Sequence, residues 1–344
     1  MKSVHFSQNP AADLQYLIQS FGYSSLGVIT DSNAVLHCYP LVKESLPAHA
    51  LISFQAGETY KNLETCTKIW EWMTNEGFDR KSLIINLGGG VVGDMGGFCA
   101  ATYKRGIRFI NVPTTLLSQV DASVGGKLGI DFQGYKNHIG VFTEPETVVV
   151  SDVFLKTLAP EELRSGYAEV LKHGLIANSN YFQSLKIADW ENQEWRTIIE
   201  KSVSIKQDVV EKDPKEAGLR KILNYGHTIG HAFESFYLDG PKHLLHGEAI
   251  AAGMIAEAFL SHQKAGLSLE ELQAIIDRLK TIFGLIAIEE QEIDEIVALC
   301  KQDKKNVGSS VRFSLLRKIG ACDYDIAVST QEIKEAITSY RSLV

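Results

Sequence analysis

The stretch Leu83-Ile84-Ile85-Asn86-Leu87-Gly88-Gly89-Gly90-Val91-Val92-Gly93-Asp94 decides the fold of the first part of the chain. Its apolar run, residues 82–87, has the length of a strand buried on both faces of a parallel sheet. The glycines that follow, Gly88, Gly90 and Gly93, fit the pattern G-x-G-x-x-G. Such glycines let the backbone approach a pyrophosphate, and the amide groups at the next helix start face the anion. The stretch favours a nucleotide-binding α/β fold, although a plain packing turn between strand and helix shares the pattern.

Four more apolar runs have the length of buried strands and alternate with helical stretches. They are residues 25–30, 51–54, 109–112 and 147–150. Between the second of these and the glycine stretch, apolar residues recur at helical spacing, namely Leu63, Cys66, Ile69, Trp70 and Met73. Alternation of strands and helices is typical of a parallel sheet covered by helices. We therefore expect an α/β domain with a Rossmann-like parallel sheet over residues 1–155.

The pattern after about residue 158 is almost wholly helical. Pro160 suits the first turn of a helix. Ser268 and Glu271 form a capping box before a periodic apolar run, and Gly284 stands where a C-terminal cap is expected. Further helices are expected around residues 293–300 and from residue 329. We therefore expect an all-α domain over residues 156–344.

The usual dinucleotide fingerprint also requires an acid about 20 residues after the glycines, at the end of the next strand. Residues 107–112 (IRFINV) contain no acid. A carboxylate does end an earlier strand, at Asp31. If that strand neighbours the glycine loop, Asp31 could hold the ribose hydroxyls of an adenosine and favour NAD over NADP. The alternative is a turn residue at a strand end.

Three segments of the second part offer metal ligands. They are residues 165–172 (SGYAEVLK), 224–231 (NYGHTIGH) and 245–248 (LHGE). His227 and His231 are four residues apart, so on a helix they share a face. Two histidines and one carboxylate leave open positions for substrate oxygens, as a catalytic zinc-type site needs. The metalloprotease motif is absent, because no Glu follows the first histidine. Alternatively, each histidine is a core or surface residue.

Composition excludes several functional classes. The 344 residues are 45% hydrophobic and 22% charged, with a net charge of −8, which is unlike a protein that binds nucleic acid or anionic membranes. No uncharged apolar run reaches about 18 residues, and residues 1–10 lack a secretory pattern. Five cysteines without a CxxC pair indicate reduced thiols and a cytoplasmic protein.

Basic residues stand within the motif segments of this acidic chain. Examples are Lys127, Lys136, Lys172, Lys206, Arg220, Lys304 and Lys305. Lysines beside glycine and apolar residues fit the binding of a small, multiply charged anion such as a phosphorylated acid. The alternative is a set of ordinary surface lysines.

Taken together, these segments resemble the 3-dehydroquinate synthase family of the sugar phosphate cyclase superfamily. The motifs that carry the resemblance are residues 88–94 (GGGVVGD), 103–106 (YKRG), 112–121 (VPTTLLSQVD), 123–127 (SVGGK), 168–172 (AEVLK), 223–231 (LNYGHTIGH), 246–248 (HGE) and 303–305 (DKK). The resemblance extends from about Asp31 to Lys305, nearly the whole chain, and its motifs are highly specific.

The resemblance implies a lyase of the shikimate pathway, on the route to aromatic amino acids. Its substrate would be 3-deoxy-D-arabino-heptulosonate 7-phosphate, and its products 3-dehydroquinate and phosphate. It further implies NAD and a divalent metal, zinc or cobalt, as cofactors, a site between two domains, and a homodimer. NAD⁺ would oxidise the C5 hydroxyl, phosphate would leave by elimination, and NADH would reverse the oxidation before an intramolecular aldol closure.

The resemblance also implies a role for individual residues. The metal would be held by Glu169, His227 and His246. NAD would contact Asp31, Asn33, Glu58, Lys61, Gly89, Gly90, Val91, Asp94, Thr114, Thr115, Asp121, Lys127, Lys136, Phe154 and Thr157. The sugar acid would contact Asp121, Lys127, Lys136, Asn137, Lys172, Lys206, Arg220, Asn224, Lys304 and Lys305, with Arg105 reaching the phosphate across the dimer interface. The catalytic residues would be His231, Glu216, Lys127 and Lys172, with proton transfer assigned to Glu216 and His231.

Two positions depart from the family pattern. Leu128 stands where most members carry Thr, and Tyr135 stands where many carry Gly before the lysine. Three other functions are considered: a cyclase that makes a different cyclitol, a metal-dependent polyol dehydrogenase, and a non-catalytic scaffold. The residues that would contact the carboxylate end of the substrate argue against a different cyclase, and the lysine set argues against a dehydrogenase. A scaffold would not need the complete set of Glu169, His227, His231 and His246.

Overall fold

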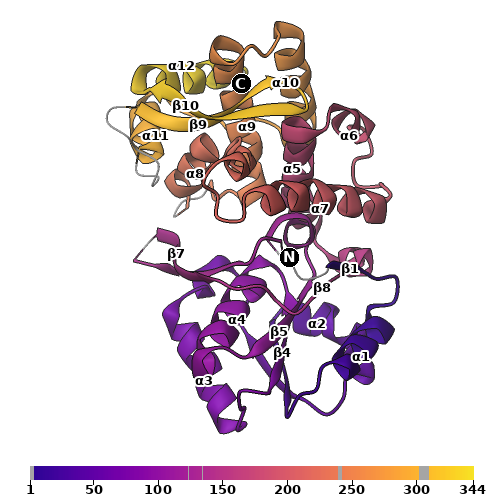
Figure 1. Ribbon diagram of the computed structural model, residues 1–344. Coiled ribbons are helices and arrows are strands. Elements are labelled where there is room, and N and C mark those ends of the chain that lie inside the picture. The colour runs from indigo at the N-terminus through magenta and orange to yellow at the C-terminus, as the bar shows by residue number, and fades with distance from the viewer. Residues whose placement is uncertain (1–3, 123, 134, 239–241, 302–309) are drawn as a thin grey trace. The chain divides into compact units, whose positions relative to one another are not determined.

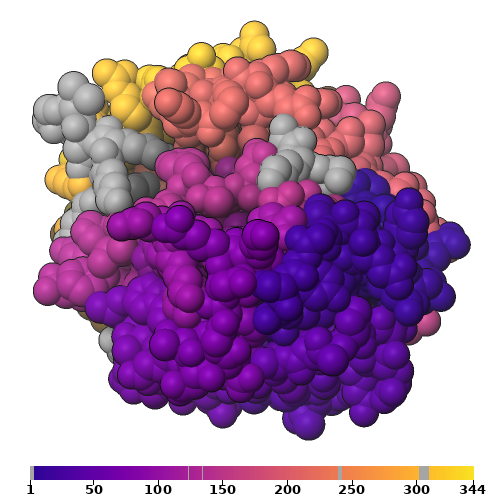
Figure 2. Space-filling model, turned by 60° about the horizontal axis from the view of Figure 1, so that its bottom comes forward, coloured from indigo at the N-terminus to yellow at the C-terminus, as the bar shows by residue number. Residues whose placement is uncertain are grey.

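The computed structural model describes residues 4–122, 124–133, 135–238, 242–301 and 310–344. The chain divides into two compact units, residues 1–159 and residues 160–344, each with its own core (Figure 1). In the space-filling view, the indigo and purple segments of the first unit form one continuous surface (Figure 2).

A parallel sheet of six strands forms the centre of the first unit. Its strand order is β1-β8-β5-β4-β2-β3, and every pairing in it is parallel. The strands are β1 (Val4–Phe6), β2 (Leu26–Asp31), β3 (Ala50–Phe54), β4 (Leu83–Gly88), β5 (Arg108–Pro113) and β8 (Val148–Val150). The five strands that the sequence predicts are confirmed. The short strand β1 was not predicted.

Helices cover both faces of this sheet. On one face, α3 (Leu63–Asn75) and α4 (Gly90–Thr102) pack with Ile29, Ile84 and Phe109. On the other face, α1 (Pro10–Ser20) and α2 (Ala34–His37) pack with alternate residues of the same strands, such as Val28 and Ile85. Burial on both faces explains why these strands are continuous apolar runs.

An antiparallel hairpin, β6 (Lys127–Phe132) and β7 (Tyr135–Phe142), packs against α4. Leu128 is buried there, and a Cβ at Gly97 of α4 would lie only 2.6 Å from its Cδ2 atom. Leu128 is thus a packing residue between hairpin and helix. The sequence pattern did not predict this hairpin, because its outward side is mostly polar.

The second unit is mostly helical. Its helices are α5 (Pro160–Ala177), α6 (Ser179–Ser184), α7 (Trp195–Lys212), α8 (His227–Phe236), α9 (His246–Lys264), α10 (Leu269–Phe283), α11 (Ile293–Cys300) and α12 (Thr330–Arg341). Helix α9 is buried along most of its length and packs against α5, α8, α10 and α12. The capping box at Ser268 and the helix start at residue 329 are confirmed, and the latter also has a capping box, at Ser329. Within the described residues, no helix is long and apolar enough to span a membrane.

Strands β9 (Ser310–Lys318) and β10 (Ala321–Ser329) form an antiparallel hairpin in the second unit. This hairpin corrects the expectation that the second part is all-α. Val311, Phe313 and Leu315 are buried at alternate positions of β9, which is the period of a half-buried strand. The alternation is short, because Ser314 and Leu316 are buried too, and the helical pattern around it concealed it.

Candidate active site

Three predicted metal ligands meet in the second unit. Glu169 comes from α5, whereas His227 and His246 are the first residues of α8 and α9. The Oε1 atom of Glu169 lies 3.5 Å from Nε2 of His227 and 3.7 Å from Nε2 of His246. Ligand atoms at the corners of a tetrahedral zinc site are about 3.3 Å apart, because each lies about 2.0–2.1 Å from the metal. The donor set and its spacing therefore fit a divalent cation.

The other ring nitrogens of the two histidines face hydrogen-bond acceptors. Nδ1 of His227 lies 3.1 Å from the carbonyl oxygen of Tyr225, and Nδ1 of His246 lies 3.4 Å from a carboxylate oxygen of Glu234. Such contacts keep a proton on Nδ1, so a metal ion would bind at Nε2 in place of any proton there. Sequence reasoning missed Glu234, although it follows His231 by three residues on the same helix.

Charge around the cluster suits a cation. Glu169 is fully buried, and its carboxylate pairs with Lys172, one turn further along α5. Burial and the nearby charge of Lys172 hold the pKa of His227 well below its usual range, so its imidazole is neutral, as a ligand must be. Burial opposes a charge on His246, but the carboxylates of Glu169 and Glu234 outweigh burial and raise its pKa to about 9. These carboxylates thus attract positive charge to this point.

His231 lies beside the three ligands. Its ring centroid is 5.1 Å from that of His227 and 5.9 Å from that of His246, so the expected shared helix face is confirmed. His231 is exposed, unlike the buried Glu169. Its ligand atom lies within 4.8 Å of ligand atoms of Glu234 and His246. An exposed histidine next to the cluster is well placed to exchange protons with solvent.

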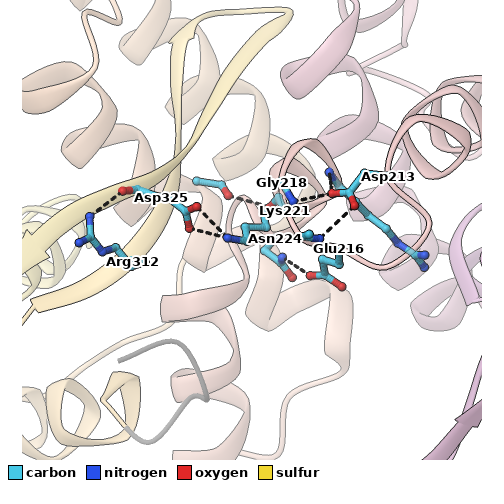
Figure 3. Close-up of polar contacts among 10 residues, drawn as sticks. Asp213, Glu216, Gly218, Lys221, Asn224, Arg312 and Asp325 are labelled. Carbon is cyan, nitrogen blue, oxygen red and sulfur yellow. Dashed lines mark hydrogen bonds and ion pairs between the residues drawn. The ribbon is translucent and has the colours of Figure 1, made fainter. Parts of the chain in front are cut away.

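A loop before α8 brings two further predicted residues together (Figure 3). Oε1 of Glu216 accepts a hydrogen bond of 2.7 Å from the side-chain amide of Asn224. The carboxylate of Asp213 organises this loop by accepting backbone N–H groups of Ala217, Gly218 and Arg220 at 2.7–3.0 Å. Asp213 was not predicted, although an Asp that opens a Pro- and Gly-containing loop is a typical turn residue.

Three of the predicted basic residues are buried in the second unit. Lys172, Lys206 and Arg220 are at most 5% exposed. Nη1 of Arg220 donates to the carbonyl oxygen of Pro214 at 2.8 Å. Because cations are rarely buried without partners, these side chains are held in place by their surroundings. Lys304 and Lys305 lie outside the described residues.

The glycine stretch of the first unit forms a pocket, which is lined by Asn86, Gly88, Gly89, Gly90, Gly93, Asp94, Asn111, Pro113, Ser118 and Ala122. Helix α4 begins at Gly90, directly after β4, without a side-chain cap and without an acid in its first turn. A Cβ at Gly88 would lie 2.4 Å from Val92, so only glycine allows this turn. The uncapped, positive end of α4 suits an anion such as the pyrophosphate of a dinucleotide.

Lys61 connects predicted nucleotide-binding residues to the β6–β7 hairpin. Its Nζ atom lies 2.7 Å from a carboxylate oxygen of Asp94, 3.8 Å from Glu58 and 2.5 Å from Oδ1 of Asn137. Burial alone would lower the pKa of Lys61, but the charges of Asp94 and Glu58 outweigh it and raise that pKa. Three predicted residues are thus brought together around the buried ammonium group of a fourth.

Asp31 ends β2, and β2 pairs directly with β4, so the neighbourhood that the nucleotide hypothesis requires is confirmed. Its Oδ1 atom accepts the backbone N–H groups of Asn33 and Ala34, so Asp31 is also a turn residue. At the end of β5, the N–H of Thr114 donates to the carbonyl oxygen of Gly88 at 2.9 Å. This hydrogen bond ties together the two strand ends beside the glycine pocket.

The loop after β5 contains two more predicted residues, Thr115 and Asp121. Thr115 and Ser118 exchange hydrogen bonds of 3.1 Å between backbone N–H and side-chain oxygen. This exchange begins the short π-helical segment Ser118–Ala122, which contains Asp121. Thr115 thus fixes the start of a segment whose residues Ser118 and Ala122 line the glycine pocket.

The remaining predicted residues of the first unit differ in exposure. Phe154 lies in the core beneath the sheet with 1% of its surface exposed, whereas Thr157, three residues further on, is exposed. Val91 is partly exposed in the first turn of α4. Asn33, Lys127, Lys136 and Arg105 are exposed as well. Arg105 follows Lys104, and both have left-handed backbone, with φ of 70° and 49°.

Comparison with known proteins gives matches along most of the chain. The family model described as "3-dehydroquinate synthase N-terminal" matches residues 51–165, and the model described as "3-dehydroquinate synthase C-terminal" matches residues 166–306. A 3-dehydroquinate synthase from Parabacteroides distasonis is 40% identical over 336 residues, which cover 96% of this chain and 95% of that protein.

Solved structures of related cyclases have the same fold. A 2-deoxy-scyllo-inosose synthase, in complex with carbaglucose-6-phosphate, NAD⁺ and Co²⁺, is 26% identical with a TM-score of 0.83, covering 98% of this chain and 96% of that one. The 2-epi-5-epi-valiolone synthase of Streptomyces hygroscopicus, with NAD⁺ and Zn²⁺ bound, has a TM-score of 0.90 at 24% identity, covering 100% and 98% of the two chains. At that identity, the second likeness concerns the fold alone.

Proposed function

Because the chain belongs to the 3-dehydroquinate synthase family, we propose that it converts 3-deoxy-D-arabino-heptulosonate 7-phosphate to 3-dehydroquinate and phosphate. The enzyme is a lyase that acts on phosphates, in the shikimate pathway. The observation that carries the proposal is the cluster of buried Glu169 with the partly exposed His227 and His246, with Lys172 against the carboxylate. This cluster is a catalytic type of metal site, because three protein ligands leave a position open for substrate.

Glu169, His227 and His246 would hold a zinc or cobalt ion. When bound, such an ion supplies Lewis-acid stabilisation of negative charge on a substrate oxygen. Glu234 orients His246 through Nδ1, and the carbonyl of Tyr225 orients His227. These two contacts keep both Nε2 atoms directed at Glu169, so the ligand set is formed before a metal arrives.

The uncapped start of α4 and the pocket of the glycine stretch would hold NAD. When bound, NAD supplies reversible oxidation of one substrate carbon and is not consumed overall. Asp31 would hold the ribose hydroxyls at the end of β2, beside β4. Lys61 keeps Asp94, which lines this pocket, and Asn137 in fixed positions.

The basic and amide side chains would bind the carboxylate and the phosphate of the substrate. We assign this role to Lys127, Lys136, Asn137, Lys172, Lys206, Arg220, Asn224, Lys304 and Lys305. Burial of Lys172, Lys206 and Arg220 strengthens their attraction for an anion, because charges interact more strongly away from water.

His231 and Glu216 would transfer protons. The hydrogen bond from Asn224 holds the carboxylate of Glu216 in one orientation.

The enzyme would act as a homodimer in the cytoplasm. Arg105 would reach the phosphate in the active site of the partner subunit. The exposure of Arg105 supports this role, and its left-handed backbone marks a strained position of the kind found at functional sites. All five cysteines are free thiols, in keeping with a reducing compartment.

A coupled assay tests the proposed reaction. Purified protein receives the heptulosonate phosphate, NAD⁺ and Co²⁺ or Zn²⁺, while phosphate, dehydroquinate and the absorbance of NADH are followed. We expect equal amounts of phosphate and dehydroquinate without accumulation of NADH, and no turnover after chelation. Turnover of sedoheptulose 7-phosphate in place of this substrate would indicate another cyclase. NADH accumulation on a simple polyol would indicate a dehydrogenase.

A further inference from the structure

We propose that Glu257 is a positioning residue for the metal site: from α9 it caps α8 and thereby fixes His227 relative to His246. The inference rests on the proposed function, because it assumes that these histidines bind a metal. Glu257 is fully buried in the middle of α9 and is not among the predicted site residues. Its two carboxylate oxygens point to the start of the neighbouring helix.

Helix α8 cannot cap itself. The residue before it, Gly226, has no side chain and adopts the left-handed conformation, with φ of 80°. Glycine is required there, because a Cβ would lie 2.4 Å from the side chain of Met254 on α9. The first N–H groups of a helix have no partners within the helix and need acceptors from elsewhere. The tight packing that excludes a capping side chain from Gly226 thus creates the need for one from α9.

Glu257 supplies that cap. Its Oε2 atom accepts the N–H of Gly226 at 2.7 Å, and its Oε1 atom accepts the N–H of Ile229 at 3.0 Å. All of these groups are buried. A carboxylate that accepts two backbone N–H groups at the positive end of a helix makes strong, charge-assisted hydrogen bonds. The first turn of α8 is therefore fixed to a definite point on α9.

His227 lies between the two donors. Gly226 directly precedes it, and Ile229 follows two residues later. Its ring is tied to α9 as well, because Nδ1 contacts the carbonyl of Tyr225, whose hydroxyl donates to the carbonyl of Met254 at 2.9 Å. Helix α9 begins with His246, so one helix provides a ligand at its start and holds a second ligand about three turns later.

Glycines bring the two helices close together. A Cβ at Gly253 of α9 would lie 2.1 Å from the carbonyl oxygen of Gly226, and a Cβ at Gly230 of α8 would lie 2.9 Å from Ile250. This close packing sets the distance between the helix axes. The hydrogen bonds of Glu257 set the position of α8 along α9. Together they determine the separation of the two histidine ligands.

The test measures Co²⁺ binding, not turnover. Metal-free wild type, Glu257→Gln and a matched control, Glu271→Gln, are titrated with Co²⁺ against a competing chelator, and the visible absorption bands of the bound ion are recorded. Glu271 also accepts two backbone N–H groups, from Ile319 and Ser268, but at the start of α10. We expect the dissociation constant of Glu257→Gln to rise about 10–100-fold, with shifted bands, since groups that orient metal ligands have effects of this size. Glu271→Gln should stay within about twofold of wild type.

Thermal melts of the metal-free proteins separate positioning from stability. Both variants should unfold at lower temperature than wild type, and only Glu257→Gln should bind Co²⁺ more weakly. Wild-type affinity and unchanged bands in a folded Glu257→Gln would overturn the proposal. If that variant does not fold, Glu257→Asp replaces it: the shorter carboxylate cannot reach both N–H groups, so its Co²⁺ affinity should fall and its bands shift, and unchanged values would overturn the proposal.

Failure of the proposed function would look different. The metal site itself, and the inference with it, would be overturned if the wild-type protein bound no Co²⁺. The same holds if the wild-type protein and Glu169→Gln bound Co²⁺ with equal affinity. Wild type that binds Co²⁺ through Glu169 but does not turn over the heptulosonate phosphate would overturn the proposed reaction only. In that case the comparison of Glu257→Gln with Glu271→Gln still decides the role of Glu257.

Discussion

The candidate nucleotide pocket of the first unit is made largely of backbone, whereas the candidate metal site of the second unit is made of ionisable side chains around a buried carboxylate. Glycines and the uncapped start of α4 form the first. Glu169, Lys172 and two histidines form the second. A backbone site is sensitive to added atoms, and a side-chain site is sensitive to changes of charge. This difference predicts which substitutions damage each site.

Loss of charge at Glu169 should have the largest effect. We expect Glu169→Gln to reduce turnover about 1,000-fold or more, because Lewis-acid stabilisation is worth several kcal/mol and needs the ion in place. The variant also leaves buried Lys172 without this carboxylate partner. Phosphate release and Co²⁺ titration measure the two effects. Glu161→Gln, at an exposed position of the same helix, is the control and should behave as wild type.

Arg105 tests whether an exposed cation of the first unit serves a second copy of the chain. Arg105→Ala should reduce turnover about 100-fold, since hydrogen bonds to a charged group are worth about 1.5–3 kcal/mol each. Mixing it with inactive Glu169→Gln should restore activity. Random pairing makes half of the dimers mixed, each with one complete site of two, so about a quarter of wild-type activity is expected. No recovery after exchange of subunits would show that Arg105 acts within its own chain, or not at all.

An added methyl group should damage the backbone site. In Gly88→Ala, the new Cβ would lie 2.4 Å from Val92, so the start of α4 must move by about 1 Å. We expect the KM for NAD⁺ to rise about 10–100-fold, as small misplacements of a binding element do, while Co²⁺ affinity is unchanged. Gly22→Ala is the control, because a Cβ at Gly22 meets nothing within 4 Å. Equal KM values for the two variants would contradict the assignment of the pocket.

A charge that belongs to neither candidate site should affect stability alone. Hydrogen bonds from Lys264 and from the N–H of Ser329 lower the pKa of Glu332 to about 2. A lowered pKa stabilises the fold above the ordinary value of 4.5, and this stabilisation is lost as the pH falls towards 2. Glu332→Gln should therefore cost about 1 kcal/mol of unfolding free energy at pH 7, and less at pH 3. Urea unfolding at both pH values measures this, with exposed Glu335→Gln as the control. Turnover at pH 7 should not change.

The structural features that could be predicted from the sequence are those that produce a local sequence pattern. The buried strands appear as apolar runs, the helix starts as capping boxes, and the shared face of His227 and His231 as a spacing of four. Asp213 and Glu234 have only weak local signals, a turn position and a spacing of three from His231, and Glu257 has none. Glu257 is 31 residues from Gly226, and a side chain that bonds to distant backbone leaves no periodicity to read. The hairpin of β9 and β10 was missed for a related reason, since its short alternation lies among helices.

The cysteine thiols offer a way to observe local unfolding of the chain. Cys66 and Cys99 are fully buried in the first unit and Cys300 is buried in the second, so an alkylating reagent reaches them only when the surrounding structure opens. Burial raises the pKa of Cys38 to about 11 and raises that of Cys99 well above its usual range, so few of their thiols ionise before opening. Labelling rates at these positions, followed by peptide mass, would thus time the opening of each unit separately. Each of the two units therefore contains a buried thiol whose labelling reports local unfolding of that unit.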